Sequence, residues 1–466
     1  MSRPHPLLFE LPTLLNLLVL SIPRLTTKKS LATCMNLSTL IPPVIQMLPE
    51  STPGLSRVVM DQVRELVDVT RMWAEGKDDW SLKGEQNSIL LSILTSSLVH
   101  LYPNLDVQSA EYAYANDRPD IRRAGFGQNG YQSGMDSILQ TALRFIRPIS
   151  PSLSASSESP KAIDILPLLT SSSQGTSTFA LLLLSHHLST STITNSEFFA
   201  SVPPPCPTSP SSWLENTLES GTVRSARSGG IVWVRCCLSA ILDSSPSTSV
   251  SPSASVDAKL IRSLWDIYLP PMATSPSSIF RQLLFDTLKQ TLHAQILDST
   301  RDALAIVHDL VKRGGEAGPM VRITGVHFLR SLIVDRGIEG SDSEFERIGK
   351  ALQDVPFGEK DENEMFCWET MEDPRGETWI RGPGPAFVVL TLGVYQLLLN
   401  KDPSSLPQTI VNHLRALPET YLRPLRAQLD IRSIPKLNDT ESVDAFETVT
   451  FALEGVEDVW KSWNKN

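Results

Sequence analysis

A glycine-rich stretch with the spacing of a phosphate-binding loop, G-x-G-x-x-G, stands at Gly125, Gly127 and Gly130. Such a loop binds a dinucleotide when a buried strand leads into it and a helix follows, because the helix amides then point at the pyrophosphate. The preceding residues 111–123 contain a proline and many charged side chains, which is not typical of a buried parallel strand. About 20 residues further on, where the fingerprint requires an acidic residue, the chain is rich in serine and proline. We therefore interpret these glycines as a connector before a helix.

Other residue types that carry chemistry show no catalytic or metal-binding spacing. The eight histidines are scattered, and neither an H-E-x-x-H nor a G-x-S-x-G motif is present. The five cysteines form no C-x-x-C pair, so we expect neither a disulfide framework nor a zinc site. His308, His327 and His413 fall within helical patterns, where a histidine is more often a packing residue than a ligand. The sequence predicts no catalytic residue, no cofactor and no metal site.

The negative charge is concentrated in one segment. The formal net charge is −10, and residues 339–377 hold thirteen acidic and four basic residues. A dedicated nucleic-acid-binding protein would instead carry a basic patch. Two interpretations of the segment stay open: a solvated loop between helices, or a docking surface for a basic protein. For the second, the candidate contact residues are Glu344, Glu346, Glu362, Glu364 and Trp368.

The first apolar run does not have the features of a membrane anchor. Residues 7–22 are interrupted by Glu10, Pro12 and Asn16, whereas a membrane span needs about 20 nearly uninterrupted apolar residues. We interpret this run as a buried helix. The sparse cysteines suit a reducing compartment, so we expect a protein of the cytoplasm, the nucleus or both, without membrane or small-molecule partners.

The dominant pattern along the chain is helical periodicity. Val59, Val63, Leu66 and Trp73 share one face of an expected helix at Val59–Trp73. Further expected helices include Thr300–Lys312 with Ser299 as its cap, Ala386–Leu399 covered on all sides, and Ser442–Trp463 with a stripe from Phe446 to Trp463. Since no strand pattern competes, we predict an all-α chain, an α-solenoid of degenerate HEAT-like or armadillo-like repeats with disordered Ser/Pro-rich insertions.

Composition divides this array into helical and linker segments. Helical repeats are expected at 1–149, 257–338 and 380–466, and shorter helical segments at 161–200 and 213–242. Ser/Pro-rich linkers are expected at 150–160, 201–212 and 243–256, and an acidic connector at 339–379. The linkers and other breaks contain Ser-Pro dipeptides that a proline-directed kinase could modify. Ser245 and Ser251 are the candidate phosphorylation sites, and the alternative is that serine and proline are simply what linkers contain.

The C-terminal part resembles a known family. "GPMVRITGVHFLRSLIVD" at 318–335, followed after the acidic segment by "PAFVVLTLGVYQLLLNKD" at 385–402, is similar to the closing repeats of the glomulin family. That family includes fungal YAP-binding proteins and plant aberrant-root-formation proteins. The resemblance implies a HEAT-like, non-enzymatic regulator that binds proteins, such as a cullin-RING ubiquitin ligase or a stress-response transcription factor. It assigns no functional residue to a position of this chain.

The leading functional hypothesis is a non-enzymatic adaptor or regulatory protein that acts through protein binding. One alternative shares the fold but differs in cargo: a transport or assembly-chaperone solenoid, importin-like or engaged in kinase maturation. The last alternative is a nucleotide-dependent enzyme that uses the loop Gly125–Gly130. For the adaptor hypothesis, the acidic segment favours a basic protein as the partner.

Overall fold

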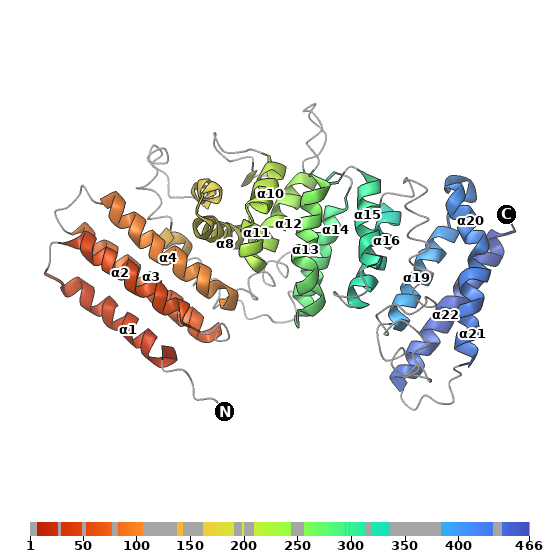
Figure 1. The fold of residues 1–466 in the computed structure, drawn as a ribbon, viewed down its shortest axis with the longest axis horizontal. Coiled ribbons are helices and arrows are strands. Elements are labelled where there is room, and N and C mark those ends of the chain that lie inside the picture. Colours follow the sequence, from red (N-terminus) through yellow and green to blue (C-terminus); the bar gives the residue numbers. More distant parts are fainter. Residues whose placement is uncertain are drawn as a thin grey trace. The chain divides into compact units, whose positions relative to one another are not determined.

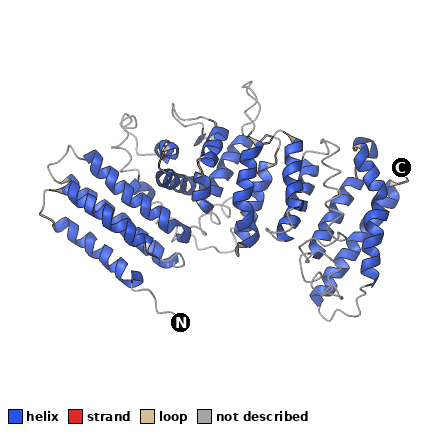
Figure 2. Cartoon of the chain, in the orientation of Figure 1, coloured by secondary structure: helices blue, strands red, loops and turns tan. Residues whose placement is uncertain are grey.

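A computed structural model gives the fold of the chain. It describes residues 7–26, 29–48, 53–76, 83–105, 138–142, 162–190, 198–199, 209–243, 256–293, 295–297, 299–312, 319–335, 384–431 and 440–465. Every regular element among these residues is a helix, and none is a strand (Figure 2). The prediction of an all-α chain is confirmed for this part of the molecule. Among the same residues, no helix combines the length and the apolar character that crossing a bilayer requires.

The chain divides into two compact units. The first consists of Met1–Ala254 with Ser277–Thr287, and the second of Ser255–Pro276 with Leu288–Asn466. Each unit is built by helices packing on helices. Helix α14 (Ser278–Thr291) is divided between them, because its residues up to Thr287 cluster with the first unit and the rest with the second.

The first unit begins with four long helices. These are α1 (Leu7–Ser21), followed by the short 3-10 turn η1 (Ile22–Arg24), α2 (Ser30–Gln46), α3 (Pro53–Glu75) and α4 (Lys83–Leu105). Helix α1 packs on α3, α2 packs on α4, and α3 packs on α4, so α1 and α2 contact helices further along the chain (Figure 1). Each of these helices therefore packs on another helix, which is how an amphipathic helix buries its apolar stripe when no sheet is present.

The stripe expected on α3 is confirmed. Val59, Val63, Leu66 and Trp73 are all buried, and the helix extends beyond them at both ends. The indole Nε1 of Trp73 also donates a hydrogen bond of 3.2 Å to the carbonyl oxygen of Leu25, just after η1. Trp73 therefore fixes the end of the first helical segment against α3.

The remainder of the first unit is η4 (Ala162–Thr170), α8 (Gln174–Thr190), α10 (Pro210–Glu219), α11 (Thr222–Ser225) and α12 (Arg227–Asp243). Helix α8 packs on η4, α4 and α12. The expected linker 201–212 overlaps α10, which already begins at Pro210. Proline is well suited to the first helical position, because its missing N–H has no partner there, and the buried Trp213 anchors the turn that follows.

The second unit contains α13 (Ala258–Thr274), α15 (Thr300–Lys312), α16 (Pro319–Asp335), α19 (Gly384–Leu399), the 3-10 turn η5 (Pro403–Ser405), α20 (Gln408–Leu417), the π-helical turn η6 (Pro418–Leu422), α21 (Arg423–Ile431) and α22 (Thr440–Trp463). Helix α15 packs on α16, α16 on α19, and α19 on α22. The buried indole of Trp265 lies against Phe328, with ring centroids 4.8 Å apart, and donates a 2.9 Å hydrogen bond to Thr291 Oγ1.

Three of the expected helices in this unit can be compared with the structure. Helix α15 has the expected bounds, and Ser299 caps it by accepting a 3.2 Å hydrogen bond from the amide of Asp302. Helix α22 begins two residues before the expected start at Ser442. The expectation that α19 is covered on all sides is wrong, because Ala386 and Gln396 on one side of it are exposed.

Candidate partner-binding surface

The residues predicted to contact a partner are not placed by the structure. Glu344, Glu346, Glu362, Glu364 and Trp368 lie outside the described residues. The same holds for the glycines at 125, 127 and 130 and for the serines at 245 and 251.

Two histidines within the described helices, His308 and His413, lie close to other side chains. His308 is buried, and its Nδ1 lies 3.8 Å from Asp309 Oδ1. His413 is stacked on Tyr395, with 3.2 Å between its Nε2 and the tyrosine hydroxyl. No group of three or more His, Cys, Asp and Glu side chains in the described part of the chain is arranged to hold a metal ion.

Helix α22 has two distinct faces. One face is apolar and packs into the second unit, with Phe446, Val449, Leu453, Val456 and Trp463 all buried. The opposite face is exposed and carries Asp444, Glu447, Thr448, Phe451, Glu454 and Asp458. These positions recur every three or four residues, which places them along one side of a helix. We call this exposed set the α22 face.

Phe451 is the most exposed large apolar side chain of the described residues, with 79% of its surface accessible. One turn later on the same face is Gly455, and a Cβ atom built on this glycine would meet nothing within 4 Å. A single exposed apolar residue is common on protein surfaces. Here the aromatic ring stands beside a glycine and between carboxylates, so another molecule can approach it closely.

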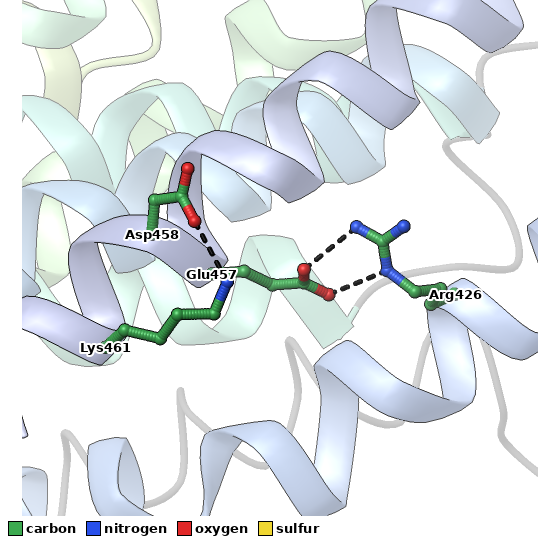
Figure 3. Close-up of polar contacts among 4 residues, drawn as sticks. All are labelled: Arg426, Glu457, Asp458 and Lys461. Carbon is green, nitrogen blue, oxygen red and sulfur yellow. Dashed lines mark hydrogen bonds and ion pairs between the residues drawn. The ribbon is translucent and has the colours of Figure 1, made fainter.

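Contacts on the sides of α22 hold the helix in place. Arg426 of α21 donates two hydrogen bonds of 2.9 Å, from Nε and one Nη, to the two carboxylate oxygens of Glu457 (Figure 3). The indole Nε1 of Trp460 donates a 2.8 Å hydrogen bond to the carbonyl oxygen of Leu414 in α20. The α22 face is therefore presented by a helix that is fixed to α19, α20 and α21, which lowers the entropic cost of binding a partner.

The charges of the α22 face vary along the helix. Four carboxylates surround Phe451, at Asp444, Glu447, Glu454 and Asp458, and basic residues come only in the last turns. There, Lys461 Nζ lies 3.0 Å from Asp458 Oδ1 (Figure 3). This order suits the helix dipole, because acidic groups are favoured near the N-terminus and basic groups near the C-terminus. The charged residues of the α22 face on either side of the phenylalanine are therefore acidic.

One sequence signal for this surface is the spacing of its phenylalanine. Phe451 is five residues after Phe446, so a helical wheel places it away from the apolar stripe. The helical periodicity of the sequence does not show whether another helix covers the side of α22 that carries Phe451. Only the packing of the second unit reveals that the ring is exposed.

Comparison with known proteins does not add a relative: no family model, no curated protein and no solved structure matches this chain.

Proposed function

We propose that this chain is a non-enzymatic adaptor or regulatory protein that acts by binding another protein through the α22 face. The observation that carries the proposal is the exposed ring of Phe451, surrounded by carboxylates on a helix whose other face is buried. Aromatic residues are enriched among the anchors of protein interfaces. A partner with a small apolar pocket rimmed by lysine or arginine would complement this surface.

The energetics favour such a contact. Burying a phenylalanine side chain contributes about 1.5–3 kcal/mol. Carboxylates at the rim add little affinity once they are screened, but they speed the encounter with a basic partner and select against acidic ones. We therefore propose association that weakens as the ionic strength rises.

The proposed architecture is an α-solenoid of HEAT-like or armadillo-like repeats. The pairing of α1 with α3 and of α2 with α4 supports it, since each helix contacts the equivalent helix of the next pair. The acidic segment 339–379 would then be a second contact region for the same basic partner. A location in the cytoplasm or nucleus would suit the buried free thiols of Cys34, Cys236 and Cys237.

Quantitative affinity purification of the full chain tests the proposal. The wild type is compared with Phe451→Ser and with a matched control, Leu40→Ser, which changes a side chain of α2 that is 62% exposed. We expect a set of basic proteins that Phe451→Ser loses, that the control keeps, and that high salt releases from the wild type. Equal recovery of the same proteins by all three chains would contradict the proposal.

A further inference from the structure

The middle of the exposed side of α22 is a straight line of residues. Its members are spaced alternately four and three positions apart: Asp444, Thr448, Phe451, Gly455, Asp458 and Ser462. All of them are exposed except Gly455, which is half-buried. Alternating steps of three and four keep residues on one side of a helix, and one helix contacts another through positions with this spacing. We call these six residues the α22 seam.

The two flanks of the α22 seam differ in chemistry. Three charged residues, seven positions apart, are exposed on one flank: Glu447, Glu454 and Lys461. Three short apolar residues with the same spacing are half-buried on the other flank: Ala445, Ala452 and Val459. Residues seven apart lie nearly above one another in a helix. Each flank is therefore a row that runs beside the seam, one row charged and the other apolar.

At the middle of the seam another molecule can come close to the backbone of α22. A Cβ atom built on Gly455 would meet nothing within 4 Å, so this glycine relieves no clash inside the chain. Glycine inside a helix is less favourable than alanine, and what it provides is room for a close approach. Phe451 lies one turn before it and is 79% exposed. A side chain of a partner can therefore reach the backbone beside the aromatic ring.

A helix suits this surface better than an extended segment does. The backbone groups of α22 are bonded within the helix, so the surface offers no strand edge with which an extended chain could pair. An extended chain laid on it would bury its own unpaired N–H and C=O groups, which is costly. A partner helix satisfies its own backbone, and its side chains can interleave with the seam.

The charges beside the seam define the chemistry of that partner helix. The exposed charged residues from Asp444 to Asp458 are all acidic, and Lys461 follows, with its Nζ 3.0 Å from Asp458 Oδ1. Glu447 and Glu454 are seven residues apart, so basic residues seven apart on a second helix would lie opposite them.

We infer that the α22 seam binds a helix of another protein. Apolar residues of that helix contact Phe451 and the open space at Gly455, and lysine or arginine residues seven positions apart lie opposite Glu447 and Glu454. This inference rests on the function proposed for the α22 face and specifies the partner: its apolar pocket is the gap between side chains of one helix.

Photo-cross-linking from both ends of the seam tests for a helix. Benzoylphenylalanine replaces Asp444 in one full-length chain and Ser462 in another, and each chain is irradiated in a cell extract. The probes are the proteins that the wild type recovers and Phe451→Ser loses. Since Asp444 and Ser462 are 18 residues apart, we expect cross-links about 18 positions apart in one basic helical segment of one protein. Cross-links to an extended segment, to a loop or to a second copy of this chain would overturn the inference.

Filling the space at Gly455 tests the close approach of the partner helix. Gly455→Leu leaves Phe451 and every charge in place, and the open surroundings of its Cβ atom should preserve the circular dichroism spectrum. It should weaken binding of the same proteins about tenfold or more, because the added side chain holds the partner helix away. Ala386→Leu, at an exposed position of α19, is the matched control and should bind like the wild type.

The outcomes separate this inference from the proposed function. If Phe451→Ser loses proteins that Gly455→Leu keeps, the partner helix is wrong and binding through the α22 face stands. If Phe451→Ser and Gly455→Leu both bind like the wild type, both proposals fail. Equal losses in Gly455→Leu and Ala386→Leu would also overturn the inference, because the effect would then not belong to the seam.

Discussion

Adding one methyl group at Gly325 is expected to destabilise the second unit. Gly325 lies in α16 where that helix crosses α15. A Cβ atom at this position would lie 3.0 Å from Val311 Cγ2, 3.1 Å from the backbone nitrogen of Val311 and 3.2 Å from Leu310 Cβ. Both neighbours are buried. The backbone atom cannot move aside by changing a rotamer, so the two helices must separate.

The change in unfolding free energy caused by Gly325→Ala is the sum of one stabilising and two destabilising contributions. Replacing glycine by alanine inside a helix stabilises by about 1 kcal/mol. Overpacking of a dense core costs about 1–3 kcal/mol. Separation of α15 and α16 also strains the 2.9 Å hydrogen bond that Arg322 Nε donates to the Val311 carbonyl, and bonds from charged groups contribute about 1.5–3 kcal/mol. The expected net loss in unfolding free energy is about 1–3 kcal/mol.

Gly393→Ala is the matched control, because a Cβ atom at this position in α19 would meet nothing within 4 Å. We expect it to stabilise by about 0.5–1 kcal/mol. Hydrogen exchange measured by mass spectrometry on peptides of α15, α16 and α19 gives the local opening free energies in the full chain. Faster exchange in α15 and α16 is expected only for Gly325→Ala. A Gly325→Ala chain as stable as the wild type would refute the close-packing argument.

Gly455→Ala should raise the melting temperature, since the added methyl enters open space and helix propensity improves by about 1 kcal/mol; no change would contradict this. Burial raises the pKa of the Cys34 thiol to about 11 and, with Cys236 contributing, raises that of Cys237. Iodoacetamide should alkylate both only after denaturation. Burial, and to a smaller extent Arg330, lower the pKa of His327. The unfolded chain therefore takes up the proton first, and the free energy of unfolding should fall as the pH drops below about 6.5. In a series of denaturation curves at different pH values, His327→Gln should reduce this dependence.

The parts of the fold that the sequence predicted are those with local signals. In α15, the capping serine at 299 and a clear apolar stripe define both bounds. In α3, acidic and basic residues occupy many of the positions between the buried ones. The apolar stripe that includes Val63 and Trp73 can therefore be recognised in the sequence. Such signals depend only on neighbouring residues and need no knowledge of the tertiary structure.

Helix α2 was not predicted, because its apolar stripe is masked. Cys34 and Ile41 are buried at helical spacing, but exposed apolar residues such as Leu40 stand between the buried positions. Its last five residues also include Pro42 and Pro43, which normally indicate the end of a helix. The contact with α4 stabilises α2 although these local signals disfavour a helix. Such a long-range contact produces no hydrophobic periodicity in the sequence of α2.

For the candidate partner-binding surface, the sequence predicts which kinds of residue form it but not which segment carries them. An acidic region with an aromatic anchor was expected around Trp368, which lies outside the described residues. The structure places a similar combination on α22, around Phe451. Whether a helix face is open or covered is decided by packing partners far away in the chain, such as α19, and single-sequence periodicity does not report them.

The affinity of an isolated partner for the full chain, measured by titration calorimetry, tests the proposed function most directly. The proposed contact would bury the Phe451 side chain, which contributes about 1.5–3 kcal/mol. Since 1.4 kcal/mol corresponds to a factor of ten, Phe451→Ser should weaken binding about tenfold or more. Added salt should weaken the wild type further. An unchanged dissociation constant for Phe451→Ser, together with insensitivity to salt, would contradict binding through the α22 face.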